Sequence, residues 1–330
     1  ATELLRKAVA LDPTFADAHA RLAYRTIFMA YYDDPKYVDI GFEIARRAIE
    51  LDPTLATAHT ALASAYGHHG RASAARASFL KAQELDPGAT AAVANIAVLD
   101  SEVLGRHDEA VASARRLLQM PPVTGNSIYH LAWPLLFLRD DATSDRWLTE
   151  GEKRFPDVPR LQYLKAALQY LRGEEAVALA RARKIVEDHP AFEEGLRFAA
   201  ELAFLTGAPD TEAHVERSFR RVPGLASGYL LKPESHQTTY AYLRMARGDR
   251  SRAATLLDEA LKNAYLALEN GNEHQRVPFE IAAIHATKGE EDQAVEWLEK
   301  AVAAGYKDFG TLGRHPIFAR ARGGPRFQNV

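Results

Sequence analysis

The sequence predicts an all-α protein: a right-handed superhelix, or solenoid, of about eight stacked helix pairs, with a leading half repeat and a carboxy-terminal cap. Three observations lead to this prediction. Proline recurs about every 34 residues, an alanine follows it at a nearly fixed distance, and a glycine often follows the alanine. A period between about 20 and 50 residues is typical of proteins built from stacked supersecondary units. We therefore expect each period to be one helix pair.

Proline closes each predicted unit. The phrase Leu-Asp-Pro ends at residues 13, 53 and 87, and later prolines stand at 122, 156, 190 and 223. The successive intervals are 40, 34, 35, 34, 34 and 33 residues. Proline lacks the backbone N–H that a helix interior needs, so it ends the second helix of one unit and begins the connection to the next.

Small residues mark the places where the two helices of a pair approach each other. An alanine stands nine or ten residues after six of the prolines, at Ala23, Ala63, Ala97, Ala132, Ala166 and Ala199. Glycines then end several first helices, at Gly70, Gly105, Gly173 and Gly207, as the C-cap preference predicts. A further alanine opens the core face of the second helix, at Ala75, Ala110 and Ala178. These small side chains predict close packing of two backbones.

The clearest copy of the unit runs from Leu55 to Pro87. It contains Leu62, Ala63, Tyr66, Gly70, Ala75, Phe79 and Ala82. Two downstream copies are Tyr240, Ala241, Gly248, Ala253, Leu257, Ala260 and Ile281, Ala282, Gly289, Ala294, Leu298, Ala301. These residues resemble the tetratricopeptide repeat, over nearly the whole chain. The resemblance implies that the first helix of each pair lines a concave inner surface and that the second faces outward.

We expect one continuous stack with two parts: a regular array over 1–223 and a less regular continuation over 224–330, which holds two further pairs and a capping tail, 310–330. The chain opens at Ala1 inside a helical pattern and without a methionine, so we expect the array to begin mid-repeat, as a fragment of a longer protein. Surplus residues interrupt the period at 31–37, 224–234 and 269–272. The first surplus is either a longer turn between helices or a projecting, tyrosine-bearing contact loop.

The tail contains a second recognisable pattern. It includes His315-Pro316, Gly323-Gly324-Pro325 and Arg326-Phe327. This is similar to the ends of tetratricopeptide regions attached to bacterial signalling proteins, namely serine/threonine kinases, nucleotide cyclases and winged-helix activators. Because the end of a solenoid needs a cap, we expect Ile317, Phe318 and Phe327 to cover the last helix pair.

The composition excludes several partners. With 41 basic and 44 acidic residues interspersed and a net charge of -3, the chain lacks the clustered positive charge that binds nucleic acid directly. No apolar run approaches the roughly 20 residues of a membrane span, so no membrane insertion is expected. The absence of cysteine excludes disulfides and thiolate metal sites. We predict a cytoplasmic location, with a periplasmic one as the alternative if the chain is attached to a membrane-spanning regulator.

No motif predicts catalysis. His19 and His59 share one repeat position, as packing variants, and His274 and His285 stand eleven residues apart, about three helical turns. No spacing resembles a zinc site, a phosphate-cradling Gly-x-x-x-x-Gly-Lys loop or a Gly-x-Ser-x-Gly elbow. We therefore predict no metal, no cofactor and no enzymatic activity.

Aromatic residues fall on the side of the first helices that faces away from the core alanines. Residues three or four apart share one helical face, which gives a candidate peptide-binding groove of Tyr24, Phe28, Asn126, Tyr129, Trp133, Phe137, Tyr163, Tyr170, Tyr242, Met245 and Phe279. Exposed aromatic surface is a sign of recognition. The alternative is that these helices are simply buried on both sides, by neighbouring repeats or by the tight inner curve. Pro134 falls within this region and predicts a kink, which either adjusts curvature or frees a carbonyl near His130.

The leading hypothesis for function is a scaffold that binds a protein partner, as a peptide or helix along the inner surface, within the regulatory part of a bacterial signalling protein. The alternative is a small-molecule-sensing effector domain, and a third is an enzyme whose site forms only in three dimensions. The Lys and Asn clamp with which some tetratricopeptide modules hold a terminal carboxylate is absent. The matching positions hold Ser64, His68, Val98 and Ser101. The partner and the oligomeric state are left open.

Overall fold

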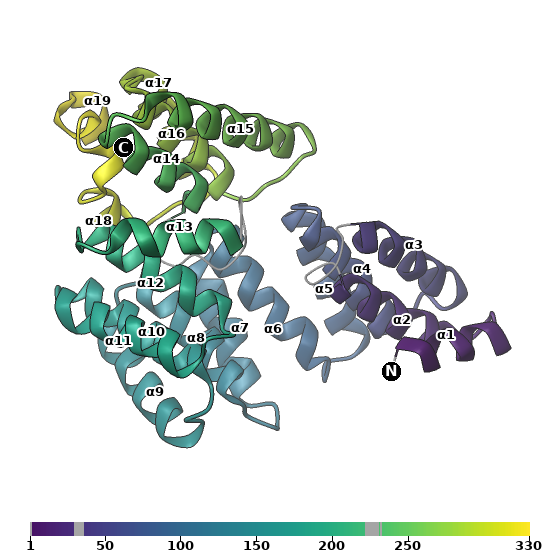
Figure 1. Cartoon of the computed structure of the whole chain (residues 1–330). Helices are drawn as coiled ribbons and strands as arrows, with labels where there is room; N and C mark the ends of the chain where they lie inside the picture. The colour runs from purple at the N-terminus through teal and green to yellow at the C-terminus, as the bar shows by residue number, and fades with distance from the viewer. Residues whose placement is uncertain (1, 30–35, 222–230, 232) are drawn as a thin grey trace.

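The computed structural model describes residues 2–29, 36–221, 231 and 233–330, and every regular element within these ranges is helical (Figure 1). The all-α prediction is confirmed. A leading helix, α1 (Thr2–Leu11), precedes eight helix pairs. They are α2 (Ala16–Met29) with α3 (Lys36–Leu51), α4 (Ala56–His68) with α5 (Ala72–Leu85), α6 (Thr90–Val98) with α7 (His107–Leu118), α8 (Gly125–Phe137) with α9 (Asp141–Arg154), α10 (Pro159–Leu171) with α11 (Glu175–Asp188), α12 (Glu193–Leu205) with α13 (Thr211–Arg221), α14 (His236–Ala246) with α15 (Arg250–Glu269), and α16 (Arg276–Lys288) with α17 (Glu291–Ala303).

The repeat alanines lie where the pairing predicts them. Ala23, Ala63 and Ala132 are fully buried, and each has bulkier apolar neighbours on the helices beside it. A methyl side chain keeps two helix axes close, so a larger residue at these positions would force the pair apart. The core of the amino-terminal pairs is therefore a series of small clusters between successive helices, whereas larger clusters join α8–α12 and α12–α19.

The tail caps the last pair, as expected. It consists of α18 (Phe309–Leu312), two 3₁₀ turns at Pro316–Phe318 and Ala321–Gly323, and α19 (Pro325–Gln328). Ile317, Phe318 and Phe327 are buried in the same hydrophobic cluster as residues of α14, α16 and α17. Phe318 packs edge-to-face on Phe279 with ring centroids 5.5 Å apart.

The structure describes the three predicted segments of extra residues to different extents. The tyrosine-bearing segment is outside the described residues except for its end, where α3 begins at Lys36, and so is the boundary at residues 223 and 224. At the third surplus, α15 extends as far as Glu269, and its 20 residues make it the longest helix among those described. Pro134 does not end its helix, because α8 continues through it to Phe137.

A π-helical segment, Leu99–Val103, follows α6 directly. Its wider turn is closed by the bond from the Leu104 N–H to the Leu99 carbonyl, at 2.9 Å. Such π segments are rare and are frequent at functional sites. Here the segment carries Glu102 towards the middle of the molecule, where it lines an internal cavity.

The superhelix closes, because its carboxy-terminal pairs contact its amino-terminal pairs. In Figure 1 the chain runs from the purple α1–α5 array through α6–α12 and returns by the green α14–α17. The turn between α15 and α16 reaches the turn between α4 and α5: the Glu273 N–H donates to the Gly70 carbonyl at 2.9 Å, and the Ser73 N–H donates to the Glu273 carboxylate at 2.6 Å. We call these bonds, together with the close approach of Gly105 to Gly305, the closing contact.

Candidate functional site

Five of the predicted groove residues are buried. Trp133 and Tyr163 are each 2% exposed, and Tyr129, Tyr170 and Phe279 are buried as well. The rings pack on one another and on the next helix, as when Tyr163 meets Phe198 edge-to-face with centroids 4.5 Å apart. The expectation of an open aromatic groove is therefore wrong for these five residues, and the alternative interpretation, burial on both sides of the inner helices, describes them.

Two segments of the chain itself cover this inner surface. Leu231 is 1% exposed and packs in the hydrophobic cluster of α8, α10 and α12. From the tail side, Tyr306 lies on Phe279 with ring centroids 4.8 Å apart, and His315 lies 5.8 Å from Phe204. Leu231 and residues of the tail thus cover the inner helices of the carboxy-terminal half.

The other predicted groove residues differ among themselves. Phe137, Tyr242 and Met245 are partly buried, and the Tyr242 hydroxyl donates to the Pro316 carbonyl of the tail at 3.4 Å. Asn126 is exposed at the start of α8. Tyr24 and Phe28 form a pair on α2 with ring centroids 5.1 Å apart, and Phe28 is 43% exposed. Tyr24 is partly buried, so Phe28 is the aromatic residue of the predicted groove that is exposed to solvent.

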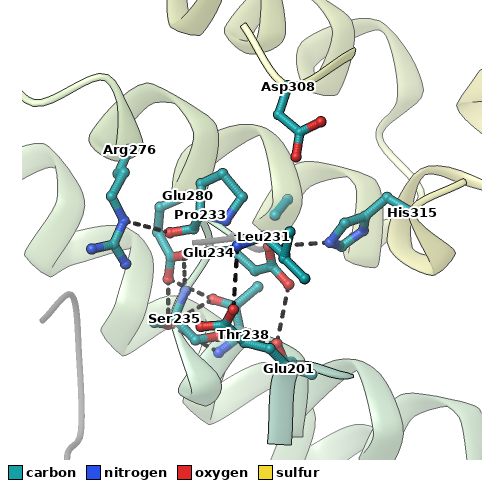
Figure 2. Close-up of polar contacts among 12 residues, drawn as sticks. Glu201, Leu231, Pro233, Glu234, Ser235, Thr238, Arg276, Glu280, Asp308 and His315 are labelled. Atoms are coloured by element: carbon teal, nitrogen blue, oxygen red, sulfur yellow. Dashed lines mark hydrogen bonds and ion pairs between the residues drawn. The ribbon is translucent and has the colours of Figure 1, made fainter. Parts of the chain in front are cut away.

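A buried polar cluster fixes the segment that enters the interior (Figure 2). The carboxylate of Glu280, on α16, is 1% exposed and accepts three bonds: from the Ser235 N–H at 2.7 Å, the Ser235 hydroxyl at 2.6 Å and the Thr238 hydroxyl at 2.6 Å. Burial raises the pKa of Glu280, and these donors lower it. Ser235 is also the N-cap of α14, so one carboxylate holds the start of that helix against its neighbour.

The tail joins the same cluster through His315. Its imidazole Nε2 lies 3.3 Å from the carboxylate of Glu234, and both side chains are buried. The Arg322 guanidinium donates to the His315 carbonyl at 2.8 Å, while the Arg276 guanidinium donates to the Pro233 carbonyl at 3.0 Å. The His-Pro motif of the tail therefore has a structural role in this molecule, since it anchors the cap to the buried segment.

A small cavity lies between the two halves of the superhelix. Its volume is about 30 Å³, and its polar lining includes Glu102, His107, Trp133, Gln275, Arg276 and Asp308. These residues come from the π-helical segment, the starts of α7 and α16, the middle of α8 and the segment before α18. No periodic sequence pattern brings these elements together; they meet because the superhelix closes.

Burial governs the charges at this cavity. It raises the pKa of Glu102 to about 7, against a lowering effect of Arg160. It lowers the pKa of His107 to about 4, so this imidazole is neutral at physiological pH. His107 stacks on Phe137 with nearly parallel rings, centroids 4.7 Å apart. Burial also raises the pKa of Asp308, which accepts a bond from the Thr311 N–H at 3.0 Å.

Sequence reasoning singled out Trp133 and Phe137 but not Glu102, His107, Gln275 or the other polar lining residues. One signal could have identified Glu102. It stands fifteen residues after its proline, in the same register as Phe28, His68 and Phe137. The inner column of the repeat therefore carries a carboxylate at the third unit, where the first, second and fourth units carry rings.

Among the described residues, one pair resembles a nucleophile beside its base. Ser218 Oγ lies 2.5 Å from His236 Nδ1, but both side chains are completely buried, so a substrate could not reach them. Within the described ranges, no group of three or more histidine and acidic side chains is placed to hold a metal ion. The described helices also include none that combines the length and the apolar character needed to cross a bilayer.

Comparison with known proteins identifies the type of repeat. Residues 56–88, which span α4 and α5, match the model of the tetratricopeptide repeat family. Human IFIT1, solved as a dimer with PPP-AAAA, is 12% identical with a TM-score of 0.52, over 87% of this chain and 72% of that one. PilW, a widely conserved type IV pilus biogenesis factor, is 15% identical with a TM-score of 0.51, over 62% of this chain and 94% of its own.

A third similar structure is a tetratricopeptide repeat protein from Parabacteroides merdae. It is 15% identical with a TM-score of 0.49, over 89% of this chain and 98% of that one. No curated protein matches the sequence. At these identities the structures show the fold alone, a tetratricopeptide-type solenoid, which is an architecture commonly used to bind other proteins.

Proposed function

We propose that this tetratricopeptide-type solenoid is a scaffold that binds a partner protein, as an extended peptide or a helix, on the inner face of its amino-terminal pairs. One observation carries the proposal. The inner helices of the carboxy-terminal half are covered by other parts of the chain, whereas Phe28 of α2 is 43% exposed beside the partly buried Tyr24. A large apolar ring that stays exposed on a curved surface favours recognition.

The accessible face extends beyond the aromatic pair. On α4, the positions in register with Tyr24 and Phe28 are Ser64, which is partly buried, and His68, which is exposed. Aromatic rings can anchor a partner at small cost in rotamer entropy, while hydroxyl and imidazole groups supply hydrogen bonds beside them. This combination suits a short peptide with one apolar anchor and polar flanks, and it does not provide the clustered positive charge that nucleic acid needs.

A selection and a pair of variants test this proposal. Peptides are selected from a displayed library on the purified chain, and their dissociation constants are then measured for Phe28→Ala and for Phe309→Ala. The control is matched, because Phe28 is 43% exposed and Phe309 is 46% exposed on the opposite part of the molecule. We expect Phe28→Ala to weaken binding by about tenfold or more, or about 1.4 kcal/mol, and Phe309→Ala to leave it unchanged. Equal affinities for the two variants would refute the amino-terminal site.

We further propose that the chain serves as a regulatory part of a bacterial signalling protein. The support is the His-Pro-x-Phe and Pro-Arg-Phe pattern of its tail, at 315–318 and 325–327. The genomic sequence around this chain tests the proposal: a kinase, cyclase or winged-helix segment in the same reading frame supports it, and a frame without any of them contradicts it.

A further inference from the structure

The cavity between the two halves of the superhelix contains polar atoms without a partner. Trp133 Nε1 and His107 Nδ1 have no hydrogen-bond partner among the described residues, and neither does Gln275 Oε1. Trp133 is 2% exposed and His107 is 3% exposed. Buried polar groups in native proteins are nearly always satisfied, so an unpaired donor beside a cavity indicates a ligand or ordered water.

The lining combines both signs of charge with apolar walls. Arg276 and Lys307 supply positive charge, while Glu102 and Asp308 supply carboxyl groups, of which that of Glu102 is about half ionised at pH 7. Phe137, Tyr306, Leu231 and Pro233 form the apolar part of the wall. A carboxylate would find the Trp133 N–H and the cations, and an ammonium would find the Gln275 carbonyl oxygen and the acids.

We propose that this cavity binds a free α-amino acid with a small side chain, such as glycine or alanine. The two groups of such a molecule match the two kinds of charge in the lining, which a simple carboxylate or a simple amine would match only in part. Its size restricts the ligand: a volume of about 30 Å³ holds about two water molecules, so the lining must move apart even for glycine, and a large side chain is excluded.

The ligand would connect parts of the chain that are far apart in sequence. Glu102, His107 and Trp133 precede residue 140, whereas Gln275 and Asp308 belong to the carboxy-terminal pairs and the tail. Gln275 already donates to the Glu102 carbonyl at 3.3 Å across this junction. A ligand that contacts both sides stabilises the closed superhelix, because it binds only where the two halves meet.

Thermal unfolding of the purified full chain tests the proposal. The midpoint is measured with glycine or alanine and, as single-group controls, with acetate or methylamine, each up to about 10 mM, ten times a dissociation constant of 1 mM. We expect the two amino acids to raise the midpoint more than either control does. No rise with any compound would mean that the cavity holds ordered water only, and an equal rise with acetate would show that the ammonium is not recognised. Either result would overturn the proposal.

Variants connect the effect to the cavity. Trp133→Phe keeps an aromatic ring but removes the N–H together with part of the indole, and Trp297→Phe makes the same change outside the lining. We expect calorimetric affinity for glycine to fall tenfold or more in Trp133→Phe and to be unchanged in Trp297→Phe. If Trp133→Phe loses its helical circular dichroism, Gln275→Leu replaces it. A folded lining variant that binds glycine as the unaltered chain does would contradict the proposed site.

Proton release gives a second signature. Burial holds the pKa of Glu102 at about 7, and an ammonium beside this carboxyl favours its ionised form. Binding at pH 7 should therefore release a proton, up to about one half per ligand. Titrations in two buffers of different ionisation enthalpy measure it, and the release should vanish in Glu102→Gln. A release that persists in that variant would exclude Glu102 as the ammonium partner.

Discussion

At the scale of single residues, burial shifts two titratable side chains of the cavity in opposite directions. Glu102 keeps its proton up to about pH 7, whereas His107 stays neutral down to about pH 4. Both shifts have the same cause, since a low-dielectric site disfavours the charged form of either group. Between about pH 4 and pH 7 both side chains are therefore largely uncharged in the folded protein. The free energy of unfolding depends on pH through such groups.

Glu102→Gln should stabilise the protein in alkaline solution. The folded pKa is about 7 and the ordinary value is 4.5, so between these values the folded chain binds more protons than the unfolded one. Stability is therefore lost as the pH rises through this window, and it stays lower above it. Glutamine has a similar shape and does not ionise, so the variant does not lose this stability. We expect its free energy of unfolding to exceed that of the unaltered chain by roughly 1–3 kcal/mol at pH 8 and by almost nothing at pH 4.5.

Urea unfolding at the two pH values measures this difference. The titration of His107 is common to both proteins and cancels in the comparison. Glu269→Gln, on the exposed end of α15, is the control and should show no pH-dependent gain. An equal gain for Glu102→Gln at both pH values would show that the carboxyl is not protonated in the folded chain.

At the scale of elements, the start of α14 depends on one side chain from another helix pair. Ser235 caps α14 and also donates its hydroxyl to Glu280. We expect Ser235→Ala to lower the free energy of unfolding by roughly 2–3 kcal/mol, because it removes an N-cap worth about 1 kcal/mol and one charged hydrogen bond. Denaturant unfolding with an unchanged slope measures the loss.

The exposed Ser251, in the first turn of α15, provides the comparison. Ser251→Ala should change stability by no more than about 0.5 kcal/mol. Amide hydrogen exchange in α14 should accelerate only in Ser235→Ala. If both variants were equally stable, the bonds to Glu280 would make no net contribution to stability.

The helix pairs could be predicted from the sequence because their determinants are local. Ala63 and Pro87 repeat at a fixed period, and the structure places them in a tight interface and at a helix end, respectively. Whether the inner surface is open or covered could not be predicted in the same way. Whether Trp133 or Tyr163 faces solvent depends on Leu231 and on the tail, and no period relates these segments to the helices that they cover.

The candidate cavity also could not be predicted, because it is formed by residues that are far apart in the sequence. Glu102 and Gln275 are separated by 173 residues and meet only after the superhelix has closed. Their types are unremarkable in sequence, since a carboxylate and an amide on helix ends are normally solvated. The tail pattern was informative for a different reason: its His315 and Phe318 are both buried, and His315 lies 3.3 Å from the carboxylate of Glu234.

At the scale of the whole molecule, the closing contact can be tested with one glycine pair. Gly105 and Gly207 both follow a first helix with a positive φ, of 63° and 65° respectively. A Cβ at Gly105 would collide with the carbonyl oxygen of Gly305, whereas a Cβ at Gly207 would meet nothing within 4 Å. Both substitutions by alanine pay the same backbone strain, of about 1 kcal/mol.

We therefore expect Gly105→Ala to be less stable than Gly207→Ala by roughly 1–3 kcal/mol. Hydrogen exchange at Ser73, whose N–H bonds to Glu273, should also accelerate in Gly105→Ala alone. Chemical unfolding and exchange mass spectrometry measure the two effects. Identical behaviour of the two variants would mean that the Gly105–Gly305 approach does not hold the halves together.

The bond from Glu273 to Gly70 has a consequence for how such a chain can be shortened. In an ordinary linear array each unit touches only its neighbours, and deleting units from one end leaves the other end intact. Here the second and last repeats are neighbours in space although about 200 residues separate them in the chain. Removal of the final repeat should therefore weaken the second one, and the protein should melt as a single cooperative body in place of fraying from its termini.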